Sequence, residues 1–166
     1  MTNTEENKYH WIIIAFGSIL RVVQYLHNTS LCLDEARDVV AGIWGRTVSS
    51  IFDLPPAIYT PTPPAGFFVI EKLVVQILGD SEYALRLIPL IVSVLSLFLF
   101  YYVAKQYIKP KAVTIALFLF AVLEPLIYYS SQAKPYTIDI AVTLLLFMIA
   151  IHIRSKKLTA LNVFVF

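Results

Sequence analysis

The chain has 166 residues, a formal net charge of +2, and a composition that is 58% hydrophobic and only 14% charged. Soluble domains are about 45–50% apolar and about 25% charged, so a soluble globular domain is excluded. The cations are scattered along the chain, which argues against a nucleic-acid partner. Cys32 is the only cysteine and the three histidines lie far apart, so neither residue type predicts a metal site.

The first apolar segment, residues 11–26, is expected to cross the membrane as an uncleaved anchor. It follows a polar stretch in which Glu5 and Glu6 oppose Lys8, whereas a secretory signal needs a cationic start and a small-residue cleavage site. Arg21 interrupts the apolar run. We place the N-terminus in the cytoplasm and expect a long external loop, residues 27–84, after this span.

The external loop begins with an acidic segment for which two interpretations stay open. Asp34 has the position of a helix N-cap, and Glu35 would lie in the first turn, where the helix dipole favours an acid. The same polar face can also supply chemistry. A carboxylate can take a proton from an attacking hydroxyl, and Arg37 can bind a phosphate bidentately. Capping and catalysis are compatible roles.

The second part of the loop combines a proline-rich stretch, residues 55–66, with an apolar segment at residues 66–78. The prolines fix φ and stiffen their stretch. The apolar segment would reach only about 20 Å, short of a bilayer core about 30 Å thick, and it contains Glu71, Lys72 and Gln76. Because these three share one helical face opposite an apolar face, we expect a helix that lies along the membrane interface.

Three further spans are expected at residues 85–104, 112–129 and 136–153, because each holds an apolar run close to the roughly 20 residues that a span needs. Lysine-rich clusters follow the first and the last of them, and the positive-inside rule places both clusters in the cytoplasm. The connection between the last two spans is then external. Arg86 lies at the outer end of its span, where a snorkelling arginine is the simple alternative to a functional one.

A fifth apolar run begins at residue 158 and stops at Phe166, which is too short to cross a bilayer. We therefore expect residues 1–166 to be the N-terminal membrane module of a larger protein. Glu124, which precedes Pro125 in the third span, is expected to be a buried acid with a structural partner. The predicted fold class is all-α: a multi-pass helical bundle in the cell (plasma) membrane, with an external loop that carries interfacial helices.

Several segments, from the start of the external loop into the last expected span, carry motifs of a known family. They are Leu33-Asp34-Glu35-Ala36; Pro63-Pro64-Ala65-Gly66-Phe67 with Glu71-Lys72-Leu73; Gly79-x-Ser81-Glu82-Tyr83-Ala84-Leu85-Arg86-Leu87-x-Pro89-Leu90; and Tyr128-Tyr129-Ser130 with Lys134-Pro135-Tyr136-x-x-Asp139. Each piece is weak alone. In this order and spacing, the set resembles the GT-C membrane glycosyltransferases that use polyprenyl-phosphate-linked sugars, including the protein O-mannosyltransferase and aminoarabinose-transferase relatives.

The resemblance implies roles for residues in the external loop, at the outer end of the span that follows it, and around the connection between the last two spans. Asp34 and Glu35 are the candidate catalytic residues, and Asp34 would help to activate the acceptor. Positively charged side chains would face the phosphate of the lipid-linked donor; they are Arg37, Arg86 and Lys134. Side chains that would line the site are Gln132, Tyr136 and Asp139; for Asp139, pairing with Lys134 is the alternative. Gln132 stands where relatives usually carry an acid, so a divalent metal is not supported and no cofactor is expected.

The reaction implied by the resemblance is inverting transfer of a sugar from the polyprenyl phosphate to a hydroxyl or amine on the external face. Membrane lipid and the polyprenyl-phosphate sugar donor are the expected partners. A separately encoded polypeptide that completes the fold is the alternative to a single larger protein. The 166-residue chain alone is expected to bind the donor weakly and to transfer no sugar. The alternative is a non-enzymatic membrane protein, either a transporter subunit or an inactive truncated relic. A transporter should have broken helices that carry polar groups within the bilayer.

Overall fold

The computed structural model describes residues 3–33, 35–36, 43 and 64–155, and all regular structure within these residues is helical. An all-α membrane fold is therefore confirmed. The helices are α1 (Asn3–His27), α3 (Ala65–Leu78), α4 (Glu82–Tyr107), α5 (Pro110–Val122), α6 (Glu124–Tyr129) and α7 (Tyr136–Ser155).

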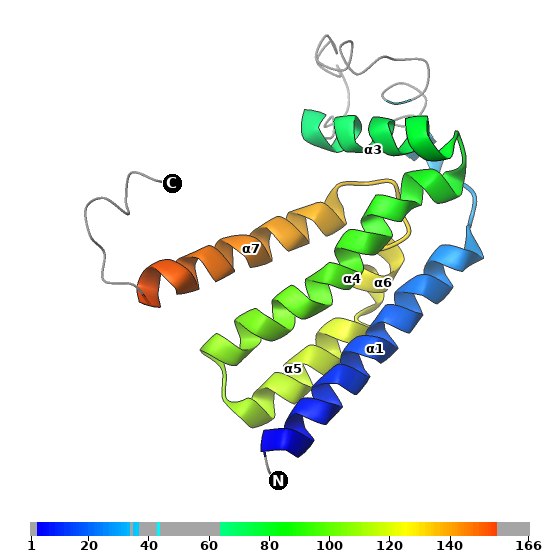
Figure 1. Cartoon of the computed structure of the whole chain (residues 1–166). Coiled ribbons are helices and arrows are strands. Elements are labelled where there is room, and N and C mark those ends of the chain that lie inside the picture. The colour runs from blue at the N-terminus through cyan, green and yellow to red at the C-terminus, as the bar shows by residue number, and fades with distance from the viewer. Residues whose placement is uncertain (1–2, 34, 37–42, 44–63, 156–166) are drawn as a thin grey trace.

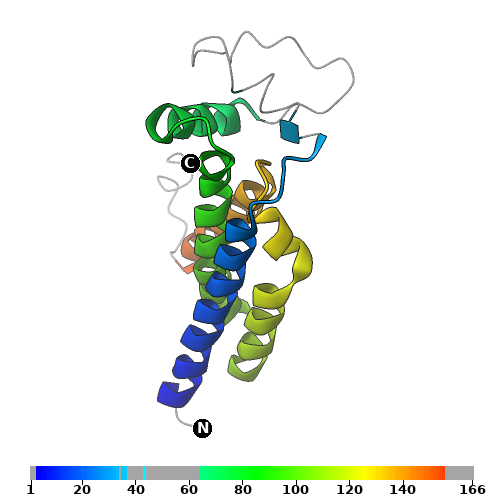
Figure 2. The ribbon, with the colours of Figure 1, turned by 90° about the vertical axis from the view of Figure 1, so that its right-hand side faces the viewer.

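The bundle is built around α4, which packs against α1, α5 and α7 (Figure 1). Its apolar core contains Ile14 of α1, Leu97 of α4, and Leu117 and Ala121 of α5. Gly17 lets α1 approach α5 closely, because a Cβ atom at that position would lie 2.9 Å from the Cβ of Ala121. Seen from the side, α1, α4 and α5 run along one another, and α6 continues beyond α5 (Figure 2).

Within the described residues, three helices are long and apolar enough to cross a membrane: Asn7–His27, Glu82–Tyr107 and Tyr136–Arg154. They coincide with the expected spans at residues 11–26, 85–104 and 136–153. The remaining expected span, residues 112–129, is divided into α5 and α6 instead of forming one helix. Together these two helices contain about the 20 residues that a crossing requires.

The division between α5 and α6 has a local cause. Leu123 leaves the helical conformation, with φ −63° and ψ 114°. Pro125 follows two residues after Leu123. Its nitrogen carries no hydrogen to donate to the carbonyl of residue 121, and a proline fits the first turn of a new helix. Glu124 opens α6 and its side chain is exposed, so the expectation that this acid is buried is wrong. An acid in the first turn is favoured by the helix dipole.

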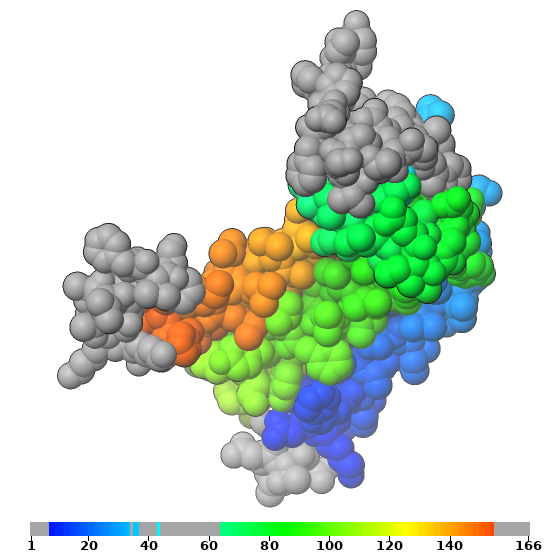
Figure 3. All heavy atoms as spheres, turned by 45° about the horizontal axis from the view of Figure 1, so that its top comes forward, coloured from blue at the N-terminus to red at the C-terminus, as the bar shows by residue number. Residues whose placement is uncertain are grey.

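Helix α3 lies across one end of the bundle and covers the first turns of α4 (Figure 3). It buries Phe67, Phe68 and Val75 against Leu85 and Ala133. Large apolar side chains remain exposed on its other side; they are Ile70, Leu73, Ile77 and Leu78. This helix is therefore as short and amphipathic as a helix at a membrane interface.

The orientation of α3 differs from the expected one at a single charged position. Glu71 was expected to share a polar face with Lys72 and Gln76, but it is fully buried. The helical period places Glu71 one turn after Phe67, on the side that packs against α4. The protein-facing side of α3 therefore combines aromatic residues with a carboxyl group.

Candidate functional site

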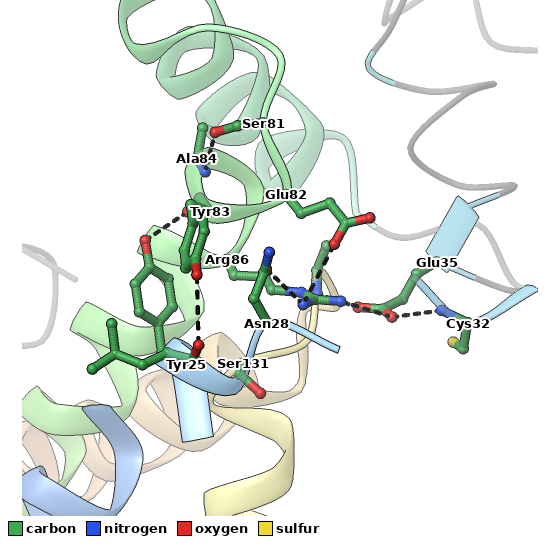
Figure 4. Close-up of polar contacts among 12 residues, drawn as sticks. Tyr25, Asn28, Cys32, Glu35, Ser81, Glu82, Tyr83, Ala84, Arg86 and Ser131 are labelled. Atoms are coloured by element: carbon green, nitrogen blue, oxygen red, sulfur yellow. Dashed lines mark hydrogen bonds and ion pairs between the residues drawn. The ribbon is translucent and has the colours of Figure 1, made fainter. Parts of the chain in front are cut away.

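Arg86 lies at the centre of a polar cluster where α1, α4 and the connection before α7 meet (Figure 4). It is carried by the second turn of α4, whose start is fixed by Ser81: the Ser81 hydroxyl accepts a hydrogen bond of 3.1 Å from the backbone N–H of Ala84. The Arg86 side chain is fully buried. The simple alternative of a snorkelling arginine is therefore wrong.

Three oxygen-bearing side chains surround the guanidinium of Arg86. Its Nη1 donates to the side-chain oxygen of Asn28 at 3.1 Å and lies 3.9 Å from Glu82, and its Nη2 lies 3.8 Å from Glu35. Among the described residues, neither Nε nor Nη2 has a hydrogen-bond partner. The guanidinium thus lies between two carboxylates, and two of its nitrogens have no hydrogen-bond acceptor in the part of the chain that the structure describes.

Glu35 is the other buried member of this cluster, and its carboxylate collects backbone donors from distant segments. It accepts hydrogen bonds from the backbone N–H groups of Cys32, at 3.0 Å, and Ala133, at 2.7 Å. With its amide oriented to satisfy both partners, Gln132 also donates to the two Glu35 oxygens, at 2.9 and 3.0 Å. Glu35 therefore ties the first loop to the connection between α6 and α7.

The contact between Glu35 and Cys32 is also a helix-capping contact. The N–H of Ala36 donates to the Cys32 carbonyl at 2.8 Å, so a helical turn begins just after Cys32. An acid three residues after the N-cap that binds the N-cap N–H is half of a capping box. The cap therefore lies at Cys32, two residues before the position expected from the sequence.

The connection between α6 and α7 is tightly folded. Ser130, Ser131, Gln132 and Ala133 are all buried, and the two serine hydroxyls donate to carbonyls of the last turn of α6. The N–H of Lys134 then donates to the Gln132 carbonyl at 2.8 Å. This compact turn aims the Ala133 N–H and the Gln132 amide at Glu35.

Two tyrosines clasp the end of α1 to the start of α4 beside this cluster. The Tyr25 hydroxyl donates to the Tyr83 carbonyl at 2.9 Å, the Tyr83 hydroxyl donates to the Leu26 carbonyl at 3.5 Å, and the two rings meet edge to face at 5.3 Å. Asn28 follows in the left-handed conformation, with φ 39°. The clasp and the turn together bring the Asn28 side chain to Arg86.

The predicted site residues differ in where the structure places them. Glu35, Arg86 and Gln132 come together in the buried cluster. Lys134 and Tyr136 follow next along the chain; Lys134 is half-buried, and the Tyr136 ring meets Tyr129 edge to face at 4.6 Å. Asp139 is exposed in the first turn of α7. Asp34 and Arg37 lie outside the described residues.

Two members of the cluster were not predicted, although the sequence held signals for both. Glu82 follows the Ser81 cap and precedes Arg86 by one helical turn, the spacing at which opposite charges pair on a helix. Asn28 directly follows the last residue of α1, where asparagine often adopts the left-handed conformation that ends a helix. Across the described part of the chain, no group of three His, Cys, Asp or Glu side chains could hold a metal ion.

Glu71 is the acid that stands apart from this network. It is fully buried in α3, and no described group donates to either of its oxygens. Burial raises the pKa of Glu71 from 4.5 to about 8, because the charged carboxylate loses its hydration. Its neighbour Lys72 donates to the carbonyl of Ile43 at 3.0 Å instead. Glu71 is thus predominantly a neutral carboxylic acid at neutral pH.

Comparison with known proteins gives a match to a family model. The family model of the dolichyl-phosphate-mannose-protein mannosyltransferases matches residues 61–162, which is more than half of the chain. Neither curated proteins nor solved structures give a significant match. The family match confirms the resemblance drawn from the ordered motifs, and it includes Arg86, Gln132 and Lys134 but begins after the segment with Asp34 and Glu35. The chain belongs to the family of dolichyl-phosphate-mannose-protein mannosyltransferases, membrane glycosyltransferases that take their sugar from a lipid-linked donor.

Proposed function

We propose that the chain serves inverting transfer of a sugar from a polyprenyl phosphate to a hydroxyl or amine acceptor on the external face of the membrane. The observation that carries this proposal is Arg86, a buried guanidinium whose Nε and Nη2 have no hydrogen-bond acceptor among the described residues. A guanidinium recognises phosphate through paired N–H groups in a fixed plane. Arg86 also lies near the end of a spanning helix, where the phosphate of a membrane-bound donor would reside.

The charge around Arg86 indicates that further cations take part. Glu35 and Glu82 already offset its positive charge. A donor phosphate adds negative charge to the same place, and during transfer the departing phosphate gains more, which nearby cations stabilise. We assign this role to Lys134, which follows the buried turn, and to Arg37.

We assign proton acceptance to Asp34 and a positioning role to Glu35. A base must reach the acceptor hydroxyl or amine, whereas the Glu35 carboxylate is buried and its oxygens are occupied by Cys32, Ala133 and Gln132. Asp34 is the neighbouring carboxylate in the sequence. Tyr136 and Asp139, both exposed at the start of α7, would line the path of sugar or acceptor.

The direct test compares Asp34→Asn with Asp80→Asn, a change in the exposed turn between α3 and α4. Transfer of radiolabelled sugar from a polyprenyl-phosphate donor is measured in native membranes, which retain any partner polypeptide. Loss of a general base lowers the rate by roughly 100-fold or more, so Asp34→Asn should fall by that factor while Asp80→Asn should not. Unchanged transfer by Asp34→Asn would show that the base is another group.

We further propose that the α3 end of the bundle is external, that the N-terminus is cytoplasmic, and that the membrane is the plasma membrane. Lys105, Lys109 and Lys111 gather at the opposite end of α4, where the positive-inside rule favours the cytoplasm. In a Cys32→Ser background, an impermeant thiol reagent added to intact cells should label Asp80→Cys and spare Lys109→Cys, both of which are exposed positions. Labelling at position 109 alone would reverse the orientation.

One observation favours the rival function of transport. The break between α5 and α6 lies within the bundle and adjoins the buried Arg21 and Ser93, as a transporter's ion site would. The cavity at this place has a volume of only about 10 Å³, however, which is about the room of one water molecule. The size of this cavity favours a structural role for the break.

A further inference from the structure

The break between α5 and α6 exposes backbone carbonyls inside the bundle. The last four carbonyls of a helix lack intrahelical donors, and here Pro125 has no N–H to offer Ala121. Hydrogen bonding resumes only with Leu126 and Ile127, both of which donate to Leu123. In a bilayer, no water is present to satisfy such carbonyls, so another group of the protein must do so.

Arg21 supplies the missing donors from α1. Its Nη1 donates to the Ala121 carbonyl at 3.0 Å, and its Nη2 donates to the Phe120 carbonyl at 3.4 Å. Nη1 also donates to the Gly17 carbonyl at 2.9 Å, and Nε donates to the Ser93 hydroxyl at 2.8 Å. The side chain is fully buried. A single guanidinium thus joins α1 and α4 to the broken end of α5.

Gly17 makes this reach possible. It lies one turn before Arg21, at the point where α1 and α5 are so close that a Cβ atom would meet the Cβ of Ala121 at 2.9 Å. Because residues four apart share a helical face, the side chain of Arg21 leaves α1 toward the end of α5. The close helix contact and the capping contact are therefore parts of one arrangement.

The region around Arg21 also contacts the start of α7. A small cavity, with a volume of about 10 Å³, is lined by Arg21 together with Ser93, Ser96 and Thr137. Thr137 is the second residue of α7, and its buried hydroxyl has no partner in the described part of the chain. The polar centre at Arg21 is thus flanked by α1, α4, α5 and α7.

We infer that Arg21 is a positioning residue for the cluster around Arg86. Helix α6 is only six residues long, and it leads straight into the turn whose Ala133 N–H and Gln132 amide hold Glu35. A change of the angle at Leu123 would move this turn away from Glu35. Arg21 fixes that angle by holding the carbonyls on the α5 side of the break, and it thereby holds Glu35 and Arg86 in register.

A double-mutant cycle tests this role through the proline that creates the need for a cap. Arg21→Met removes the donors and keeps an unbranched apolar stem, whereas Pro125→Ala returns an N–H to the position that faces the Ala121 carbonyl. The reporter is Ser131→Cys in a Cys32→Ser background, because Ser131 is only 1% exposed in the turn that α6 positions. The rate of reaction with a small maleimide reports how often that turn opens.

Arg21→Met should accelerate labelling roughly tenfold or more, which corresponds to the loss of buried hydrogen bonds of about 1.4 kcal/mol. Pro125→Ala in the same chain should return the rate to within about threefold of the reporter alone. Ser18→Ala is the matched control, because the Ser18 hydroxyl donates only to the Ile14 carbonyl of its own helix. Unchanged labelling in Arg21→Met, or equal acceleration with and without Pro125→Ala, would overturn the proposal.

Two additions keep the test decisive. If Arg21→Met does not accumulate in membranes, Ser93→Ala takes its place in the cycle, because the Ser93 hydroxyl accepts a hydrogen bond from Nε of Arg21. Faster labelling in Ser93→Ala that Pro125→Ala relieves supports the proposal, and unchanged labelling overturns it. The consequence for the donor rests on the proposed function: Arg21→Met should raise the KM for a polyprenyl-phosphate sugar more than it lowers kcat. Labelling of Ser131→Cys does not require the sugar donor. If labelling changes as expected but the protein binds no polyprenyl-phosphate sugar, the proposed function is contradicted and the positioning role of Arg21 is not.

Discussion

Two arginines are fully buried among the residues that the structure describes, and they are bonded in opposite ways. Arg21 directs its nitrogens at three backbone carbonyls and one hydroxyl. Arg86 lies between the carboxylates of Glu35 and Glu82, with one hydrogen bond to Asn28 and no hydrogen-bond partner in the described residues for Nε or Nη2. Every nitrogen of the Arg21 guanidinium is thus bonded within the bundle, whereas two nitrogens of Arg86 have no acceptor among the described residues.

This difference matches the surroundings of the two side chains. A buried charge is tolerated when hydrogen bonds or opposite charges compensate for its lost hydration. Arg21 lies beside a break in a helix within the bundle, where carbonyls need donors. Arg86 lies at the end of the bundle beneath α3, where a lipid-linked phosphate would meet the membrane surface. Every guanidinium nitrogen of Arg21 has an acceptor, which fits a structural role, whereas the nitrogens of Arg86 that have no acceptor among the described residues fit the binding role proposed for it.

The largest expected effect on folding comes from removing the paired arginine. Arg86→Met leaves the Glu35 carboxylate buried without its counter-charge, and breaking a buried ion pair costs about 3–5 kcal/mol. The three donors that remain on Glu35 favour the lower end of that range. Arg21→Met strands carbonyls but no charge, so we expect the smaller loss of about 1–3 kcal/mol.

Thermal unfolding of the two variants in the same detergent measures this order. Glu35→Gln, added to Arg86→Met, removes the stranded charge and should recover part of the lost stability. Arg154→Met is the matched control, because this arginine is exposed near the end of α7. A greater loss in Arg21→Met than in Arg86→Met would reverse the comparison between the two arginines.

The sequence predicted the parts of the fold that depend on composition. The helices α1, α4 and α7 follow long apolar runs, and any such run must satisfy its own backbone as a helix in the membrane. The break before Pro125 was not predicted, although the proline is visible in the sequence. A proline within an apolar run allows either a kinked or a broken helix, and the choice depends on a donor, Arg21, that arrives from α1.

The site was predicted only as a set of residues, and its geometry was not. Motif order selected Glu35, Arg86 and Gln132, but the contact between Glu35 and Ala133 joins residues 98 positions apart. No local pattern reports such a contact. For the same reason, the face of α3 was predicted with Glu71 among polar neighbours, whereas packing against α4 buries it. Hydrophobic periodicity shows that a helix has two faces without showing which face meets the protein.

Glu71 extends the comparison to an acid that is buried without a partner. Its pKa is raised to about 8, so the folded protein binds a proton at this position that the unfolded chain, with a pKa of about 4.5, releases. The free energy of unfolding should therefore fall as the pH rises from about 4.5 through about 8. Glu71→Gln, which stays neutral, should unfold a few degrees higher than the wild type at about pH 8.5 and nearly equally at about pH 5.

Thermal unfolding at these two pH values checks the effect of Glu71→Gln. Lys72, the adjacent cation of α3, is turned to the Ile43 carbonyl and does not compensate for the acid. Asp80→Asn is the control, because this acid is exposed at the turn after α3. An equal shift at both pH values would mean that ionisation of Glu71 has no part in the effect.

The smallest effect is expected at the second acid beside Arg86. The Glu82 side chain is 35% exposed and lies 3.9 Å from Nη1, so water and salt screen its attraction to the guanidinium. Exposed pairs one helical turn apart contribute about 0.3–0.5 kcal/mol, and Glu82→Gln should cost no more than about 1 kcal/mol in unfolding measurements. Its effect should shrink further in high salt.

Glu35→Gln, at a fully buried acid with three donors, should cost more and change little with salt, because both groups of that pair are shielded from ions. Equal costs for the two variants would show that burial does not determine how much each acid contributes to stability beside Arg86.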